Sequence, residues 1–296
     1  MTTPAQARGL ISLLRLPYWL MTGGLSLLTA FAIAKNPLSL SIQTVLLIFF
    51  SMAFITSAGF AINDYFDRES DAVIKPKRPI PSGALSLKQV LAISSVLFAV
   101  GLVMAFFINW LSFAVIAADS ALLLVYSMVV KRKSGFAANV LVGVLTGTAF
   151  MYGEATISSP PTVSLISLSL YPIALGTIGG NVLRDILSLD GDSKTGYPTL
   201  PQKIGASTST KVAAAFFLLT GLFAPLPFFV GNFSAYYLLP ILVWSVLLVY
   251  SAVRLVTVSS TFSNVRKYER IVTMSMILLP LALILQAVSH IVGGLV

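Results

Sequence analysis

Residues 41–71 read SIQTVLLIFFSMAFITSAGFAINDYFDRESD, an apolar run that ends abruptly in a cluster of acids. A helix needs about 20 consecutive, mostly apolar residues to cross the hydrocarbon core of a bilayer. The run 41–62 is long enough and therefore predicts a transmembrane helix. The acids of 63–71 are then expected at the membrane surface, where this helix ends.

The rest of the chain repeats this pattern of long apolar runs. Of its 296 residues, 57% are hydrophobic and 10% charged, which lies outside the usual composition of soluble domains. We therefore expect one all-α domain, residues 1–296, that crosses the membrane repeatedly. Nine transmembrane helices are predicted, over residues 17–34, 41–62, 88–108, 110–130, 137–157, 162–183, 212–231, 235–257 and 271–293.

Basic residues predict the orientation of these spans. All but Lys35 of the 19 lysines and arginines fall on one side of the predicted bundle, and short cytoplasmic loops of membrane proteins are enriched in such residues. We expect a cytoplasmic N-terminus and an external C-terminus in an integral cell-membrane protein. The positive charge then needs no nucleic-acid partner, and the absence of cysteine excludes disulfides and thiolate metal sites.

Seven of the ten acidic residues lie in two clusters, at 63–71 and 184–192. In a continuous helix, Asn63, Asp67 and Asp71 would follow one another at intervals of four, with Asp64 beside them. Carboxylates that share a helix face repel one another unless a cation neutralises them. Magnesium prefers such oxygen ligands and is often held by one or two carboxylates together with substrate phosphates.

The second cluster repeats the spacing of the first. Asp185, Ser188 and Asp192 are spaced three and four residues apart, as Asp64, Asp67 and Asp71 are. Four predicted spans separate the clusters, so both should emerge on the cytoplasmic side and could clamp metal ions on one diphosphate. The predicted Mg²⁺ ligands are Asn63, Asp64, Asp67, Asp71, Asp185 and Asp192, and the five aspartates among them are the predicted catalytic residues.

A proline-containing segment follows each cluster. Residues 75–83 read KPKRPIPSG, and residues 194–201 read KTGYPTLP. Proline restricts the backbone and disrupts regular helices. We expect both segments to form ordered, non-helical caps over the site.

These motifs resemble the UbiA-type intramembrane prenyltransferases. The signature asparagine, aspartate, two residues, aspartate, three residues, aspartate is intact from Asn63 to Asp71, and RPIPSG at 78–83 is similar to archaeal digeranylgeranylglyceryl phosphate synthases and to chlorophyll synthases. In the second motif Ser188 replaces the usual acid, so whether Ser188 or Asp190 helps to bind metal is left open. Further similarity lies in Tyr126, Lys131, Gly135 and Asn139.

The resemblance implies a helical bundle around a central cavity that opens sideways to lipid. It implies Mg²⁺ as the cofactor and a prenyl diphosphate as the donor, whose departing charge is stabilised by metal and cationic side chains. The residues expected to bind substrate are Arg78, Lys131, Tyr126, Lys75, Arg184, Asn139 and Arg15, the last of which could reach an anionic head group.

The expected reaction is transfer of a geranylgeranyl group to geranylgeranylglyceryl phosphate, a step of archaeal ether-lipid synthesis. Transfer to an aromatic or tetrapyrrole acceptor is the alternative. A cation transporter is a more remote interpretation, because transporters place acids near the midplane. Only Asp119 and Glu154 lie within predicted spans, where an ionisable group suggests function. The sequence alone predicts neither the length of the prenyl chain nor the oligomeric state, and no protein partner is evident.

Overall fold

A computed structural model describes residues 4–195, 198–231 and 233–293. In these residues all regular structure is helical, and nine helical segments are long and apolar enough to cross a membrane. The predicted all-α, nine-span protein is therefore confirmed. These segments are Pro4–Ile33, Ile42–Phe66, Leu87–Ile108, Trp110–Lys133, Gly135–Ile157, Leu165–Leu187, Leu200–Phe229, Ala235–Thr257 and Phe262–Gly293.

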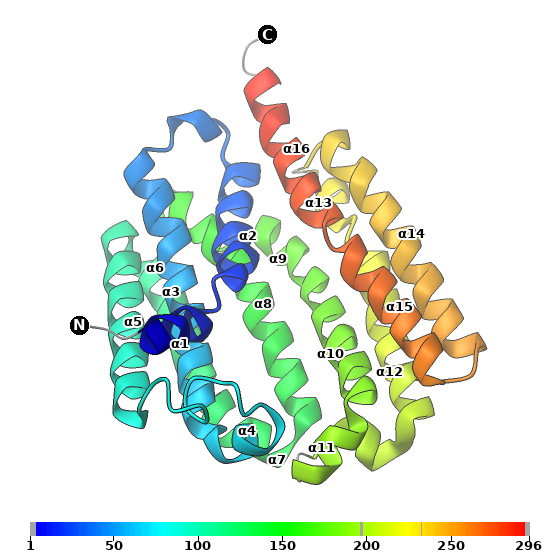
Figure 1. Ribbon diagram of the computed structural model, residues 1–296. Coiled ribbons are helices and arrows are strands. Elements are labelled where there is room, and N and C mark those ends of the chain that lie inside the picture. Colours follow the sequence, from blue (N-terminus) through cyan, green and yellow to red (C-terminus); the bar gives the residue numbers. More distant parts are fainter. Residues whose placement is uncertain (1–3, 196–197, 232, 294–296) are drawn as a thin grey trace.

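Several spans are divided into shorter helices (Figure 1). The α-helices are α1 (Pro4–Leu14), α2 (Pro17–Ile33), α3 (Ile42–Phe66), α4 (Arg68–Ile74), α5 (Leu87–Ile108), α6 (Trp110–Val125), α7 (Lys131–Lys133), α8 (Gly135–Ile157), α9 (Leu165–Leu170), α10 (Leu175–Leu187), α11 (Leu189–Thr195), α12 (Leu200–Phe223), α13 (Leu226–Phe229), α14 (Ala235–Thr257), α15 (Phe262–Ser275) and α16 (Leu278–Gly293). A π-helical turn, η2, covers Tyr126–Val130, and 3-10 turns η1 and η3 cover Pro37–Ser39 and Tyr171–Ala174.

The predicted spans matched the apolar centres of these helices better than their polar ends. The seventh span was expected from residue 212, whereas α12 begins at Leu200. Its first turns contain a kink at Gly205, whose φ of +78° is readily adopted only by glycine. Hydropathy does not mark such polar helical ends, because it measures burial in lipid rather than helix formation.

Helix α8 lies between the two halves of the bundle. It packs against α2 and α6 on one side and against α10 on the other, and α16 returns at the end of the chain to pack against α2. The approach of α8 to α2 is close: a Cβ atom on Gly153 would lie 2.6 Å from the Ser26 carbonyl oxygen. Small residues permit such contacts between membrane helices.

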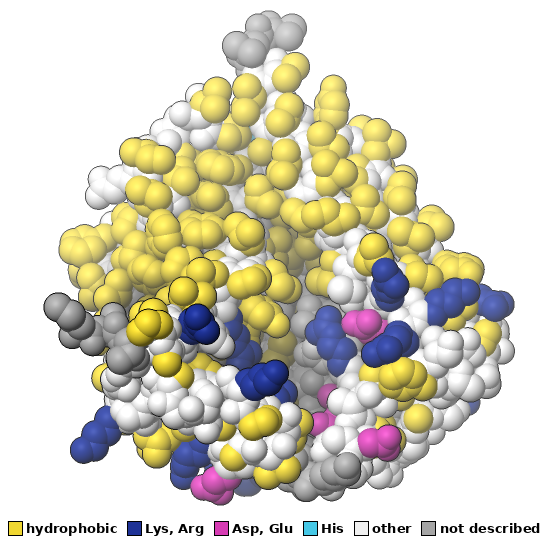
Figure 2. Space-filling model, viewed as in Figure 1, with side chains coloured by type: hydrophobic (Ala, Val, Ile, Leu, Met, Phe, Trp, Pro, Cys, Tyr) yellow, Lys and Arg dark blue, Asp and Glu magenta, His cyan; other side chains and the backbone are white. Residues whose placement is uncertain are grey.

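Polar and charged side chains gather at one end of the molecule. In Figure 2, hydrophobic side chains cover the upper part of the surface, and Lys, Arg, Asp and Glu lie around the lower part. Helices α4, α7 and α11 are at this lower end in Figure 1, and the end of α16 is at the opposite one. We call the lower end the motif end, because both acidic clusters lie there.

The two acids inside the spans differ in their surroundings. Glu154, 2% exposed, accepts hydrogen bonds from the Ser164 backbone N–H at 2.8 Å and from the Ser164 and Ser167 hydroxyls at 2.5 Å. It therefore joins α8 to the start of α9 and is structural. Asp119, 3% exposed, accepts one bond from the Thr148 hydroxyl at 2.8 Å.

We expect Glu154→Ala to destabilise the fold. The substitution removes the acceptor of three hydrogen bonds, among them the buried one from the Ser167 hydroxyl, and an unsatisfied buried donor typically costs about 1–3 kcal/mol. Thermal unfolding in detergent should show a Tm several degrees lower, with a smaller decrease for Glu154→Gln, which keeps one oxygen. Glu69→Ala is the control, because the Glu69 side chain is 86% exposed. Equal Tm values for Glu154→Ala and Glu69→Ala would show that the Glu154 contacts do not stabilise this corner.

Candidate active site

The first acidic cluster lies at a break between two helices. Helix α3 ends at Phe66, and Asp67, with φ −86° and ψ 1°, connects it to α4. The cluster side chains are nonetheless buried: Asn63 is 9% exposed, Asp64 3%, Asp67 6% and Asp71 4%. Buried carboxylates require compensating charge or hydrogen bonds.

Two arginines compensate Asp64 and Asp71. Arg78 Nη1 lies 2.6 Å from Asp64 Oδ1 and 2.7 Å from Asp71 Oδ2, so that it bridges the two carboxylates. Arg15 Nη2 lies 2.7 Å from the same Asp64 oxygen, and its guanidinium group lies over the Phe60 ring, 4.2 Å from the ring centroid. Arg15 lies between α1 and α2. Its φ of +49° is unfavourable for a non-glycine residue.

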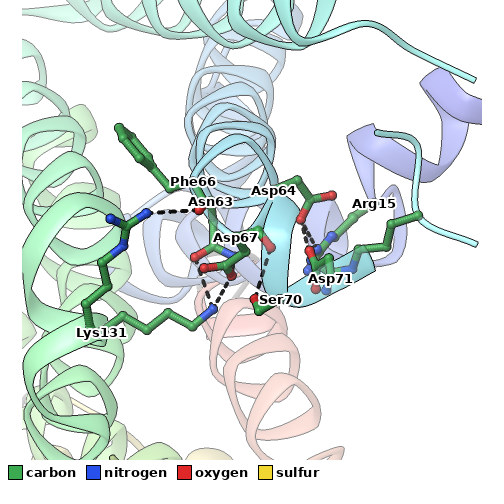
Figure 3. A network of polar contacts seen from close by, with 10 residues as sticks. Arg15, Asn63, Asp64, Phe66, Asp67, Ser70, Asp71 and Lys131 are labelled. Atoms are coloured by element: carbon green, nitrogen blue, oxygen red, sulfur yellow. Dashed lines mark hydrogen bonds and ion pairs between the residues drawn. The ribbon is translucent and has the colours of Figure 1, made fainter. Parts of the chain in front are cut away.

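Asp67 has different partners from Asp64 and Asp71. Its Oδ2 accepts a hydrogen bond from Asn63 Nδ2 at 2.8 Å and forms an ion pair with the Lys131 ammonium group. In Figure 3, Lys131 approaches Asn63 and Asp67 from one side, and Arg15 lies with Asp64 and Asp71 on the other. The prediction of one shared carboxylate face is therefore wrong, because the helix break at Asp67 divides the cluster.

Lys131 reaches Asp67 from the end of a π-helical turn. The Lys131 backbone N–H bonds to the Tyr126 carbonyl, five residues earlier, and π turns of this kind occur often at functional sites. Tyr126 lies within electrostatic range of both Asp67 and Asp185. The turn therefore brings a phenol and an ammonium group to the region between the two clusters.

The second cluster is less buried than the first, since Asp185 and Asp192 are half-buried and Ser188 is exposed. Asp185 Oδ2 accepts a hydrogen bond from Asn139 Nδ2 at 2.7 Å, which connects α10 to α8. Ser188 donates to Asp192 Oδ2 at 2.6 Å, and Asp190 is exposed. Because α11 packs against α4, the helices that follow the two clusters meet at the motif end.

Arg184 does not join the other predicted substrate-binding residues. Its Nε lies 3.4 Å from Glu269 Oε1 on α15, and its Nη1 donates to Asn181 Oδ1 at 3.1 Å. The side chain is 53% exposed, against 20% for Arg15, 19% for Arg78 and 22% for Lys131. Its predicted contact with a donor diphosphate remains a prediction, and in the structure its partners are Glu269 and Asn181.

The two predicted caps differ. Residues 75–83 are non-helical, as expected, and contain Gly83 at φ +73°. In the second cap, Lys194 belongs to α11 and Leu200 opens α12, so the prediction of a wholly non-helical segment is wrong; residues 196–197 lie outside the described residues.

Partial desolvation, and then the charge of Arg78, lower the pKa of Lys75, whereas Asp71 acts in the opposite direction.

The side-chain oxygen atoms of the two clusters suit a hard cation. They are carboxylate and amide oxygens, the ligands that Mg²⁺ prefers. Within the described part of the chain, no three His, Cys, Asp or Glu side chains converge closely enough to form a metal cluster. Mg²⁺ is commonly held by one or two carboxylates, with its remaining ligands from water and substrate phosphates, and the carboxylate and amide oxygens present here fit that mode of binding.

Two residues beside these clusters were not expected from the sequence. Phe60 supports the Arg15 guanidinium, and its position three residues before Asn63 gave no signal in an apolar run. Glu269 is the partner of Arg184. As a single acid among the basic residues Arg266, Lys267 and Arg270, it could have been recognised.

Comparisons with known proteins give the family. The model of the UbiA prenyltransferase family matches residues 24–283. A digeranylgeranylglyceryl phosphate synthase of Natronomonas pharaonis is 37% identical over 235 residues, which cover 79% of this chain and 82% of the relative. The protein of the same name from Methanococcoides burtonii is 37% identical over 205 residues, covering 69% of this chain and 72% of the relative.

Solved structures have the same fold. A structure described as a digeranylgeranylglyceryl phosphate synthase superposes with a TM-score of 0.82 at 26% identity, covering 96% of this chain and 99% of that one. A UbiA homologue from Archaeoglobus fulgidus, bound to GPP and Mg²⁺, gives a TM-score of 0.68 at 18% identity, covering 94% and 99%.

Removing Arg78 should destabilise the protein in a way that Mg²⁺ reverses. Loss of one partner from a buried ion pair typically costs about 3–5 kcal/mol, because an uncompensated charge remains. We expect Arg78→Gln to lower the free energy of unfolding by about 3 kcal/mol, and Mg²⁺ to raise the Tm of this variant more than that of the unmodified protein. Arg68→Gln is the control, because Arg68 pairs with the exposed Glu69. A Mg²⁺ response equal in all three proteins would argue against a cation site at Asp64 and Asp71.

Proposed function

This chain belongs to the UbiA prenyltransferase family, and on that basis we propose that it transfers a geranylgeranyl group from its diphosphate to geranylgeranylglyceryl phosphate. It is a multi-pass membrane prenyltransferase. The observation that best supports the proposal is the pair of acidic clusters at one end of the bundle, with Tyr126 near an aspartate of each.

The residues proposed to act on the donor come from both acidic clusters and from the side chains that bind them. Bound Mg²⁺ would neutralise the diphosphate and so favour its departure from the allylic carbon. Lys131 and Arg78 would place positive charge beside the leaving oxygens, and charge-assisted hydrogen bonds to them are stronger than neutral ones. The Tyr126 hydroxyl would donate another bond, and Asn139 would hold Asp185 in position.

The apolar interior would protect the reacting carbon. Spans packed around α8 exclude bulk water, which would otherwise trap an allylic cation as an alcohol. The acceptor hydroxyl attacks the allylic carbon, the carbon–oxygen bond to diphosphate breaks, and the hydroxyl proton is released to the diphosphate or to water. The products are an ether and inorganic diphosphate.

The names of the relatives support the proposed acceptor. Both named relatives are digeranylgeranylglyceryl phosphate synthases and align over at least two thirds of this chain. The test is an acceptor panel with geranylgeranyl diphosphate, Mg²⁺ and the purified protein in lipid. We expect an ether product with geranylgeranylglyceryl phosphate, and none with 4-hydroxybenzoate or a tetrapyrrole. Product formation only with one of the latter two acceptors would overturn the proposal.

Substituting one aspartate of each cluster tests the proposed metal clamp. Asp67→Asn and Asp185→Asn keep the size of the side chain but remove its charge, and loss of one preorganised electrostatic contact typically lowers kcat about 100- to 1000-fold. We expect diphosphate release to fall by about this factor in each variant, and to be unchanged in Glu69→Gln, whose side chain is exposed. Retained turnover in both aspartate variants would remove these residues from the mechanism.

We also propose that the motif end faces the cytoplasm, since Lys and Arg side chains gather around that end (Figure 2) and such residues are enriched on the cytoplasmic side of membrane proteins. The chain has no cysteine, so single cysteines can report the orientation. In cells, a membrane-impermeant maleimide should label Lys35→Cys directly and Lys133→Cys only after permeabilisation, because both positions are exposed. The reverse labelling pattern would invert the topology.

A further inference from the structure

A recess opens at the side of the bundle, near the motif end. In Figure 1, α8 is visible between α2 on one side and α10 with α15 on the other, and Figure 2 shows the surface hollowed there. Cβ atoms on Gly24 of α2 or Gly180 of α10 would meet no atom within 4 Å. Away from the motif end, α16 packs against α2 and limits the recess.

Arg184 lies in the last turn of α10 and reaches Glu269 on α15, the two helices that border one side of the recess. It follows Gly180 by four residues on α10, so the two residues share a helix face. Arg184 forms an ion pair with Glu269 at 3.4 Å, and pairs that are this long and half-exposed contribute little. Arg15, Arg78 and Lys131, in contrast, are each bound to a buried aspartate.

From this geometry we infer that Arg184 binds the phosphate of the acceptor, with the acceptor's apolar chain lying along Gly180 toward the membrane interior. The inference deepens the proposed function and depends on it. It moves Arg184 from the donor diphosphate, where the sequence placed it, to the second substrate.

Charge supports this assignment. Both substrates are anionic, and their phosphates would repel each other unless each had its own counter-charge. The donor has the cations beside the two clusters, whereas a lipid phosphate arriving from the bilayer would first meet the rim of the recess. A guanidinium group suits that position because it can bind a phosphate through two parallel hydrogen bonds. Asn181, which already holds Arg184 Nη1 at 3.1 Å, would fix the orientation of the group.

The test is to measure steady-state kinetics for both substrates in Arg184→Gln, Arg184→Lys and Lys267→Gln. Loss of a hydrogen-bonded charge pair is expected to raise the KM for geranylgeranylglyceryl phosphate about 10- to 100-fold in Arg184→Gln, with the KM for geranylgeranyl diphosphate unchanged. Arg184→Lys should recover part of the affinity. Lys267→Gln is the matched control on the neighbouring helix α15 and should behave like the unmodified protein.

A second substrate separates a phosphate contact from a general structural effect. The same glyceryl ether without its phosphate should be a poor acceptor for the unmodified protein, and Arg184→Gln should use it no worse, so that the preference for phosphate disappears. If Arg184→Gln kept the full preference for phosphate, or raised the KM for geranylgeranyl diphosphate instead, the inference would be overturned. If the unmodified protein used no phosphorylated acceptor, the proposed function itself would fail.

Discussion

The fold places buried carboxylates at the end of a membrane bundle, and their need for counter-charge organises the rest of the site. Asp64, Asp67 and Asp71 are each at most 6% exposed. Such groups are stable only when cations or hydrogen-bond donors surround them. The chain supplies Arg15 from the first span, Arg78 from the loop after α4 and Lys131 from the end of the fourth span. Segments far apart in sequence are thereby joined at one point.

Two local departures from α-helical geometry determine which carboxylate has which partner. The break at Asp67 turns this side chain away from Asp64 and Asp71, and the π turn before Lys131 presents Tyr126 and Lys131 to it. Asp67, rather than Asp64, lies within electrostatic range of Tyr126, as does Asp185 of the second cluster. Asp64 on α3 instead pairs with Arg15, which lies between α1 and α2, and Arg78 of the 75–83 segment bridges Asp64 to Asp71 on α4. The first cluster thus has one side toward the second cluster and one side toward the cap.

Most of the fold follows from the sequence because long apolar runs have few ways to satisfy their backbone in lipid. The eighth span was predicted as residues 235–257, the bounds that α14 has. The partners of the first cluster were not predictable in this way, since Arg15 and Lys131 reach it from segments distant in sequence and periodicity reports only one helix at a time. The pairing of Arg184 with Glu269 was not predictable either. The two residues are distant in sequence, and only the packing of α15 on α10 brings them together.

We propose that a divalent cation and a prenyl diphosphate bind between Asp67 and Asp185. The most direct measurement is a crystal structure with Mn²⁺ in place of Mg²⁺ and an unreactive thiolo analogue of the prenyl diphosphate, with the metal located by anomalous scattering. We expect anomalous peaks beside Asp67 and Asp185, with Lys131 and Tyr126 directed at the diphosphate. Peaks confined to other positions, with the Asp67–Lys131 ion pair unchanged around a bound analogue, would contradict this proposal.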